Sequence, residues 1–458
     1  MNLALFFIII ILLIHNNQVI NEYKNIFTNI KVLRMKKLKV AIAGLGTVGK
    51  SVYNILSDDA HSLKQKHNVE FEVIAASART KKSFLKDNVK FYENAVDMAD
   101  NKDIDIIIEV IGGSNIAKDL IIKSISNKKH FITANKALLA EYGYEIAKIA
   151  DNNNVNIGFE ASTVGALPII KSFKNNFAAV NHIKEFYGIL NGTCNFILTK
   201  MAEEGKEFSD VLKEAQDKGY AESDPTFDIK GIDAGHKLAI LSSIAHGSKP
   251  NFKDQYIEGI DNIEINDIKL ASELGYKIKL LGIYKSQEEP FQAVYPALID
   301  QKSMIAKVEN TFNTVVTNCS NAGWSMLVGH GAGGMITASA IVADLVDIAN
   351  DHNSKIFLHN ANSLKDTKIR DISQRNGSYM IRIEIKKENI AKDRELFKFI
   401  FEDKFEINKS AYLTQEDKLV AGFILHNIKE SDIISFISNM KHENIINAKF
   451  IRVEDLEF

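Results

Sequence analysis

Residues 40–52 read Val-Ala-Ile-Ala-Gly-Leu-Gly-Thr-Val-Gly-Lys-Ser-Val, a short apolar run that passes directly into a glycine-rich turn. Apolar residues then recur at helical spacing, which predicts a strand, a tight turn and a helix in that order. In such a motif Gly44 permits the turn, Gly46 lets the backbone approach a pyrophosphate, and Gly49 lets the helix pack against the strand. The helix N-terminus would direct its N–H groups at phosphate oxygens. This stretch therefore predicts a dinucleotide-binding α/β domain.

Cofactor contacts are predicted along this loop and at the end of the next strand. The loop contacts are Gly44, Leu45, Gly46, Thr47, Val48 and Gly49. A second apolar strand at 71–76 is followed by Ser77, Arg79 and two lysines, where an NAD-selective site usually carries an acidic residue for the ribose hydroxyls. A basic group at this position can instead bind a 2′-phosphate. We therefore predict that NADP is preferred and NAD possible, with a solvated basic loop as the alternative reading of Arg79.

Two further apolar runs, at 105–111 and 130–133, end in glycine or polar residues. In an open α/β sheet, ligands bind beyond the carboxyl ends of the strands. We therefore expect Gly112, Ala134 and Lys136 to line the cofactor cleft, although Lys136 as a solvated lysine is also compatible with the pattern.

A second glycine-rich loop follows much later in the chain, at 329–334, and leads into an apolar helix. No apolar strand precedes it in the manner of a nucleotide fold. We expect residues 330–350 to return to the first domain, where Gly331 and Gly333 would close over the cofactor.

Charged residues gather between Gly219 and Lys237, where four carboxylates precede a lysine. The carboxylates are Glu222, Asp224, Asp228 and Asp233. Asp233 and Lys237 share one face if the segment is helical, and the residues that follow are apolar. Charges that enter a buried element need partners, and a cationic, hydroxyl-bearing substrate would supply one.

Upstream of this segment, Asn191 and Thr193 offer neutral hydrogen-bonding groups at the end of a predicted strand. Such groups suit substrate orientation, and a simple Asn-Gly turn is the alternative.

Composition excludes several classes of protein. The 458 residues are enough for two or three domains, and 46% of them are hydrophobic. A formal net charge of −2 gives no electrostatic case for binding nucleic acid or an anionic membrane. Two cysteines, Cys194 and Cys319, suit a reducing cytoplasm and exclude a disulfide framework or a four-cysteine zinc site. Nothing beside Cys194 would lower its pKa, so we interpret it as a packing residue.

The predicted fold class is α/β, with an NAD(P)-binding Rossmann domain, an α+β catalytic and dimerisation domain with a mixed sheet, and a small C-terminal domain. The predicted boundaries are 1–34 for a leader, 35–165 for the Rossmann domain, 166–329 for the catalytic domain, 351–377 for a linker and 378–458 for the C-terminal domain. Residues 1–34 are expected to be disordered or to precede the true start, and a membrane anchor is the alternative. The last domain has the strand–helix–strand–strand–helix–strand order of a ferredoxin-like module.

Residues 35–349 resemble the homoserine dehydrogenase family. The most specific part of the resemblance runs from Ala215 through Gly219, Pro225, Asp228, Gly231, Asp233 and Lys237. Four shorter motifs also match, at 135–140, 159–162, 191–193 and 331–334. The resemblance implies NADPH-dependent, reversible reduction of L-aspartate 4-semialdehyde to L-homoserine, a step toward threonine, methionine and isoleucine. It also implies a homodimer or homotetramer.

The resemblance implies a role for each matched residue. Lys237 would give and take the substrate proton, and Lys136 would lie between nicotinamide and substrate. Asp233 would help to position the substrate and Lys237. Glu222 would bind homoserine, with Asp228 as its partner. Backbone carbonyls of the loop would hold a monovalent cation, usually sodium; they are Glu160, Thr163, Gly165 and Leu167.

The C-terminal domain resembles the family's amino-acid-binding (ACT-like) module. The aspartate, proline and glycine that usually precede its first helix are missing, which leaves threonine feedback an open question.

Two other functions compete with the dehydrogenase. An aspartate-semialdehyde dehydrogenase would need an activated cysteine with a histidine partner, and a sensor protein would bind ligands without turnover.

Overall fold

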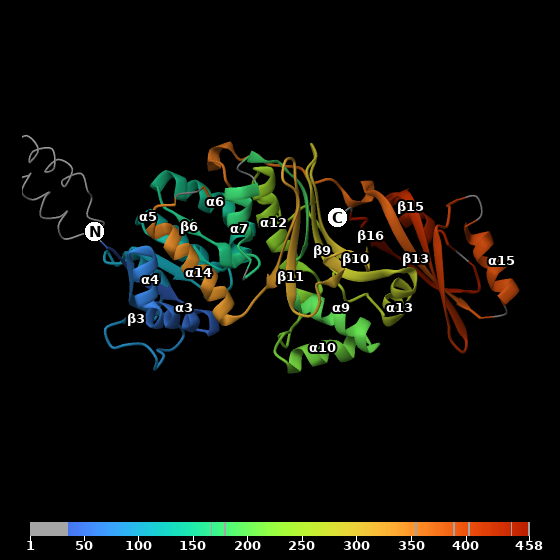
Figure 1. Ribbon diagram of the computed structural model, residues 1–458, viewed down its shortest axis with the longest axis horizontal. Coiled ribbons are helices and arrows are strands. Elements are labelled where there is room, and N and C mark those ends of the chain that lie inside the picture. The colour runs from blue at the N-terminus through green and yellow to red at the C-terminus, as the bar shows by residue number, and fades with distance from the viewer. Residues whose placement is uncertain are drawn as a thin grey trace, which may run out of the picture.

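The computed structural model describes residues 35–165, 167–177, 180–352, 355–387, 390–401, 404–440 and 442–456. The predicted leader, residues 1–34, lies outside the described residues. The molecule is elongated, with the N-terminal sheet at one end, a second sheet through the middle, and the C-terminal helices at the other end (Figure 1).

The N-terminal sheet is parallel and has six strands in the order β3-β2-β1-β4-β5-β6. The strands are β1 Lys36–Ala43, β2 Val69–Ser77, β3 Lys90–Tyr92, β4 Ile106–Glu109, β5 His130–Thr133 and β6 Ile157–Gly158. The connecting helices are α3 Thr47–Asp58, α4 Ala60–His67, η1 Ala95–Asp100, α5 Asn115–Ser126 and α6 Lys136–Asn153. The strand order reverses between β1 and β4, which creates a crevice at their carboxyl ends.

One helix from far along the chain packs on this sheet. Helix α14 (Gly334–Ala349) lies among the N-terminal elements in Figure 1. Its side chains Ala338, Ile341 and Leu345 share a hydrophobic core with Val40 and Val52. This packing brings the second glycine-rich loop back to the first, as the sequence predicted.

The second sheet has ten strands and is mixed. Its order is β12-β11-β7-β9-β10-β16-β13-β15-β14, and β8 pairs with β10. The strands of its first half are β7 Ile183–Ile189, β8 Tyr256–Ile257, β9 Tyr276–Lys285, β10 Phe291–Asp300, β11 Phe312–Cys319 and β12 Gly323–His330. Those of its second half are β13 Asn376–Lys386, β14 Lys409–Thr414, β15 Lys418–Lys429 and β16 Ile445–Val453. The pairs β10–β8 and β10–β16 are parallel, and the other pairs are antiparallel.

The helices of the middle region are η2 Glu160–Ser162, α7 Ile169–Lys171, η3 Ser172–Phe177, α9 Gly192–Glu204, α10 Phe208–Asp217, α11 Thr226–Ile229, α12 Ile232–His246, α13 Ile265–Leu274 and η4 Ile305–Lys307. Of these, α9, α12 and α13 contact strands of the second sheet. Helix α12 is buried on nearly every side from Asp233 to Ile244. A helix that is apolar all round belongs in the interior, so the charges at its start enter a buried element, as the sequence predicted. None of the described helices is long and apolar enough to cross a membrane.

The C-terminal elements follow the predicted order β13-α15-β14-β15-α16-β16, with helices α15 Ile390–Phe401 and α16 Glu430–Ser438. Both helices share a core with one face of the four C-terminal strands, formed by residues such as Tyr379, Phe397 and Phe423. The other face meets α13, where Leu270 shares a core with Met380 and Ile424. In the described part of the segment before β13, the helical turns are η5 Ala361–Ser363 and η6 Ile372–Gln374.

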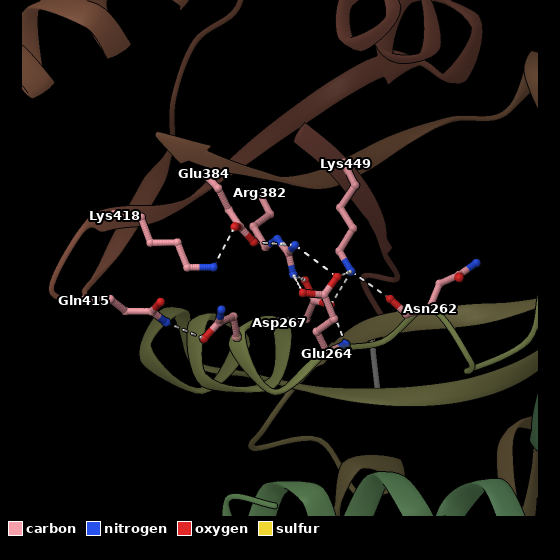
Figure 2. Close-up of polar contacts among 9 residues, drawn as sticks. Asn262, Glu264, Asp267, Arg382, Glu384, Gln415, Lys418 and Lys449 are labelled. Atoms are coloured by element: carbon pink, nitrogen blue, oxygen red, sulfur yellow. Dashed lines mark hydrogen bonds and ion pairs between the residues drawn. The ribbon is translucent and has the colours of Figure 1, made fainter. Parts of the chain in front are cut away.

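Figure 2 shows a polar network that ties these C-terminal strands to α13. The guanidinium of Arg382, with 1% of its side chain exposed, lies 3.0 Å from Asp267 of α13 and 2.6 Å from Glu384 of its own strand. Lys449 reaches Asp267 from β16, and Lys418 reaches Glu384 from β15. Asp267 is completely buried, so its charge is compensated by Arg382 and Lys449 rather than by water.

Candidate active site

The first glycine-rich loop has the geometry of a phosphate cradle. Gly44 adopts a φ of +104°, and a Cβ on Gly49 would lie only 1.8 Å from the carbonyl oxygen of Gly44. A Cβ on Gly46 would meet nothing within 4 Å. The first and third glycines are therefore required by backbone packing, while the second faces open space at the N-terminus of α3. Such an opening fits the pyrophosphate of a dinucleotide.

The neighbouring residues of the predicted cofactor loop differ in their exposure. Leu45 is buried beneath the turn, Val48 is half-buried, and Thr47 is exposed on the first turn of α3. At the end of β2, the Ser77 carbonyl accepts a 2.8 Å hydrogen bond from the Gly44 N–H, so the basic stretch that contains Arg79 starts beside the cradle. Arg79 is exposed.

A buried carboxylate that the sequence interpretation missed organises the ends of β4 and β5. Glu109 accepts hydrogen bonds from the Thr133 hydroxyl at 2.6 Å and from the Ile111 N–H at 2.8 Å. Burial raises its pKa, and these bonds oppose that shift. Its position directly before Gly112 in an otherwise apolar run was the signal that could have identified it. Because Glu109 fixes the loop that holds Gly112, it shapes one wall of the crevice.

Asn135 connects the same two strand ends. Its side chain caps α6 by accepting from the Leu138 N–H, and it donates to the Gly113 carbonyl at 2.6 Å. The next residue, Lys136, therefore leaves the end of β5 in a fixed direction, and Ala134 lies on the same edge.

The second glycine-rich loop closes against the first. A Cβ on Gly334 would lie 2.8 Å from the Thr47 side chain, so the start of α14 touches the first turn of α3. A Cβ on Gly331 would overlap the amide of Asn313, and one on Gly165 would lie 2.6 Å from the Gly331 carbonyl oxygen. Gly333 has a φ of +139°. The predicted cofactor loop thus lies between the dinucleotide crevice and the predicted cation loop.

Asp233 lies at the centre of the charged cluster and holds two lysines. Its Oδ1 lies 2.8 Å from Nζ of Lys136, and its Oδ2 lies 2.8 Å from Nζ of Lys237. The second pair has the helical i,i+4 spacing that the sequence predicted. Lys237 also donates to the Leu190 carbonyl at 2.6 Å, and its side chain is 10% exposed. One carboxylate therefore aims a lysine from the dinucleotide sheet and a lysine from α12 at the same place.

The pKa values follow from this arrangement. Burial alone would raise the pKa of Asp233, but the two lysines lower it far below its usual range. Burial opposes the charged form of Lys136. The combined attraction of Asp233, Asp228 and Glu222 outweighs burial and raises the pKa of Lys136. Burial and the neighbouring Asp233 raise the pKa of Asp228. The cluster thus keeps Asp233 ionised beside its cations.

Asn191 links the two aspartates. Its amide nitrogen lies 2.8 Å from Oδ1 of Asp228 and 2.8 Å from Oδ2 of Asp233, while its oxygen accepts from the Cys194 N–H and caps α9. Each group of this amide is therefore engaged within the protein. In this structure Asn191 positions the carboxylates, which differs from the direct substrate contact predicted from the sequence.

The remaining predicted substrate residues surround the cluster. Glu222 is exposed and close enough to favour the charged form of Lys136. The Thr193 hydroxyl donates to the Tyr220 carbonyl at 2.7 Å, which joins α9 to the acidic segment. Asp224 accepts from the Thr226 N–H at 3.1 Å and so shapes the turn around Pro225.

Cys194 lacks the environment of a nucleophile. It is buried, its Sγ lies 3.2 Å from the Asp228 carbonyl oxygen, and burial raises the pKa of its thiol well above the usual range. A thiol of this kind does not form a thiolate near neutral pH. This geometry argues against the aspartate-semialdehyde dehydrogenase alternative.

The predicted cation loop begins with a carboxylate that turns inward. Glu160 accepts from the Ile170 and Lys171 N–H groups at 2.8 and 3.0 Å, and 3% of the residue is exposed. Within the described part of the chain, no group of three or more His, Cys, Asp or Glu side chains could hold a metal ion. A cation bound at this loop would therefore depend on carbonyl oxygens, including those of the buried Thr163 and Leu167.

Known proteins with similar sequences and structures identify the family of this chain. Two family models match: "Homoserine dehydrogenase, NAD binding domain" at residues 44–160 and "Homoserine dehydrogenase" at residues 168–346. A homoserine dehydrogenase from Neisseria gonorrhoeae is 44% identical over 318 residues, which cover 69% of this chain and 73% of that protein.

Solved structures extend the similarity. A homoserine dehydrogenase from Thiobacillus denitrificans has a TM-score of 0.84 at 36% identity and covers 92% of this chain and 99% of its own. A hyperthermophilic archaeal homoserine dehydrogenase, solved in complex with NADPH, has a TM-score of 0.60 at 26% identity and covers 70% of this chain and 99% of its own. On these similarities and on the two-lysine site, the chain belongs to the homoserine dehydrogenase family.

Proposed function

We propose that this protein is an NADPH-dependent homoserine dehydrogenase that reversibly reduces L-aspartate 4-semialdehyde to L-homoserine, a step toward threonine, methionine and isoleucine. The observation that carries the proposal is the placement of Lys136 and Lys237 on the two oxygens of Asp233, where the dinucleotide sheet meets the second sheet. When bound, the dinucleotide supplies a hydride to the aldehyde carbon. The protein has to supply a proton and stabilise the developing alkoxide.

Lys237 is the proposed proton donor. Its ammonium is held by Asp233 and by the Leu190 carbonyl, which leaves its remaining N–H for the aldehyde oxygen. In the oxidative direction the same amine accepts the proton and returns it to water. Lys136 adds a second positive charge near the oxygen, and it extends from the cofactor crevice.

The carboxylates are proposed to select the substrate by its ammonium group. Asp228 is half-buried and faces the cluster through Asn191, while Glu222 is exposed at the entrance. Both carboxylates belong to the acidic segment between Gly219 and Lys237. The ammonium of an amino-acid substrate would therefore be attracted without displacing the Asp233–lysine pairs.

Cofactor preference is proposed from the end of β2. Arg79 and its neighbouring lysines replace the acidic residue of an NAD-selective site, so we propose NADPH as the preferred cofactor. The solved archaeal complex with NADPH supports the choice by analogy. Equal Michaelis constants for NADPH and NADH would refute it.

Three further features are proposed from the resemblance. A sodium ion would be held by the backbone carbonyls of Glu160, Thr163, Gly165 and Leu167. The C-terminal strands and helices would form an ACT-like module, whose proposed boundaries are 378–458. The protein would assemble as a homodimer or homotetramer. Support comes from the inward-turned Glu160 carboxylate and from the order of the C-terminal elements.

The deciding experiment replaces the proposed proton donor. Lys237→Ala should lower kcat for NADPH oxidation with the semialdehyde by about 100-fold or more, because the alkoxide loses its proton source. Binding of NADPH, followed by its fluorescence, should be unchanged. Lys230→Ala is the matched control, since Lys230 lies in the same segment but pairs with Asp261 on the surface. Near-normal turnover in Lys237→Ala would refute the role, and NADPH binding without turnover in the wild type would support the sensor alternative.

A further inference from the structure

Asn313, the second residue of β11, carries an amide that the proposed mechanism does not use. It is completely buried, and both its Nδ2 and its Oδ1 are sealed from solvent without a hydrogen-bond partner. Among the described residues it is the only one for which both side-chain polar atoms are in this state. Buried polar groups are nearly always paired, so an amide with two unpaired groups requires an explanation.

The amide lies between two glycines from different parts of the site. A Cβ on Gly331 would lie 2.4 to 2.5 Å from the carbon, oxygen and nitrogen of the amide, so Gly331 covers its flat face. A Cβ on Gly192, the first residue of α9, would lie 3.1 Å from Oδ1. Any side chain at either glycine would therefore overlap the amide or its surroundings. The two glycines keep the space around this amide free of side chains.

Asn313 is also next to the strand end that holds the catalytic lysine. In the pairing of β11 with β7, Thr314 lies opposite Ile189, which places Asn313 beside Leu190. The Leu190 carbonyl accepts the 2.6 Å hydrogen bond from Lys237. The amide is therefore one cross-strand step from the anchor of the proposed proton donor.

The N-terminus of α9 supplies complementary chemistry at the same place. Asn191 caps the helix by binding the Cys194 N–H, and the N–H groups of Gly192 and Thr193 have no partner within the helix. A helix N-terminus of this length favours an anion. The Asn313 amide lies beside it with Oδ1 as the atom nearest Gly192, and no hydrogen bond fixes which end of the amide faces α9. If the amide turns over, its N–H adds a side-chain donor at the helix N-terminus and its oxygen accepts from a cation. A carboxylate and an ammonium on one carbon match this set.

We propose that Asn313 binds the α-amino-acid head group of the substrate after its amide turns over, so that Nδ2 meets the α-carboxylate at the N-terminus of α9 and Oδ1 faces the ammonium. This assignment rests on the proposed function. Because both polar atoms of the amide are sealed and Gly331 lies against it, binding in this way requires the backbone at Gly331 to move off the amide. Asn313 then selects substrates that carry a carboxylate, whereas Glu222 and Asp228 respond to the positive charge.

The test compares Asn313→Ala and Asn313→Asp with a control on the same strand. Thr317→Val removes a buried, unpartnered hydroxyl four residues further along β11, and it should behave as the wild type. Asn313→Ala should raise KM for L-homoserine by about 10- to 100-fold with a smaller change in kcat, because one charge-assisted hydrogen bond is lost. Asn313→Asp should raise KM further, because its charge repels the carboxylate. NADPH binding, measured by fluorescence, should be unchanged in all three variants.

Two substrate analogues identify the group that the amide binds. L-2-aminobutyrate keeps the carboxylate and the ammonium, so Asn313→Ala should weaken its inhibition by a similar factor. 3-Aminopropan-1-ol lacks the carboxylate, so its inhibition constant should change far less. Equal weakening of both inhibitors, a loss of NADPH binding, or an unchanged KM would each overturn the proposal, the last by showing that a buried water satisfies the amide. Absence of homoserine oxidation in the wild type would instead overturn the proposed function itself.

Discussion

At the scale of single residues, the site is organised around one carboxylate. Asp233 contributes one oxygen to Lys136 and the other to Lys237, and its lowered pKa shows that the lysines outweigh its burial. Removing either lysine would leave a buried charge only partly compensated, which is costly. Lys136 and Lys237 therefore share Asp233 as a partner, and each lysine stabilises the carboxylate that the other lysine contacts.

Asn191 has a role that can be separated from its function as a helix cap. Its amide lowers the pKa of Asp228, so Asn191→Ala and Asn191→Ser should both move the acidic limb of the kcat/KM profile to higher pH. Only the alanine variant loses the cap of α9, at a cost of about 1 kcal/mol of unfolding free energy, because serine can replace it. The pH profile and a urea titration distinguish the two effects. An acidic limb that stays in place in both variants would contradict the bridging role.

Local spacing predicted part of the site and could not predict the rest. The Asp233–Lys237 pair follows from helical periodicity, and the strand-end position of Lys136 follows from the rule for open α/β sheets. The bond between Lys136 and Asp233 depends on how the two sheets dock, which no local pattern encodes. Asn313 was missed for the same reason, since its importance comes from two glycines distant in sequence.

At the scale of elements, α14 is joined to the predicted cation loop by buried acids. Asp344 accepts from the Glu160 N–H at 2.9 Å, and Lys171 lies between Asp344 and Asp347. Burial, reinforced by the charge of Asp344, raises the pKa of Glu160 to about 7. Burial likewise raises the pKa of Asp344 to about 6. Protonation of Glu160 and Asp344 should therefore affect the contact between α14 and this loop.

Stability should therefore depend on pH through Glu160. Its folded pKa lies above the unfolded value, so the folded state binds more protons between roughly pH 4.5 and 7, and the unfolding free energy should fall as pH rises through that window. Glu160→Gln should make the slope shallower by at most about 1.4 kcal/mol per pH unit. Denaturant titrations at several pH values measure it, with the exposed Glu93→Gln as control. Identical slopes for wild type and Glu160→Gln would rule out the linkage.

Most elements were predictable because their patterns are strong. The strand–turn–helix at 40–52 and the buried helix that carries Lys237 appear where their patterns predicted them, and the six C-terminal elements follow the predicted order. Boundaries were less accurate: β13 begins at Asn376, inside the predicted linker. That linker also packs, since Phe357 is fully buried beside Gly143. Its polar composition concealed the few apolar residues that anchor it.

At the scale of the whole molecule, the second sheet joins the middle and C-terminal regions. Strand β16 pairs with β10 on one side and with β13 on the other. The face of the C-terminal strands opposite α15 and α16 meets α13, where Arg382 and Lys449 neutralise Asp267 (Figure 2). The sequence could not predict that β16 would pair with β10, because the alternation of residues within a strand does not specify its neighbour in the sheet.

Arg382→Met should destabilise this junction strongly. The substitution leaves the buried Asp267 and Glu384 short of a cation, which should lower the unfolding free energy by about 3 to 5 kcal/mol. Lys418→Met is the matched control, since Lys418 contacts Glu384 from a more exposed position and should cost no more than about 1 kcal/mol. Denaturant titration of both variants measures the difference. Similar losses for the two substitutions would show that Arg382 does not anchor the junction.

The place of β16 in the second sheet also bears on biogenesis. It is the last strand in chain order, yet it lies in the interior of the sheet. Until residues 445–453 have been synthesised, β13 and the Ala297–Leu298 part of β10 keep unpaired N–H and C=O groups, and such edges template aggregation. A chain that ends before Ile445 would thus retain the proposed catalytic residues but expose two strand edges that can pair with other chains. A chain that lacks this late strand should therefore aggregate more readily than the complete chain.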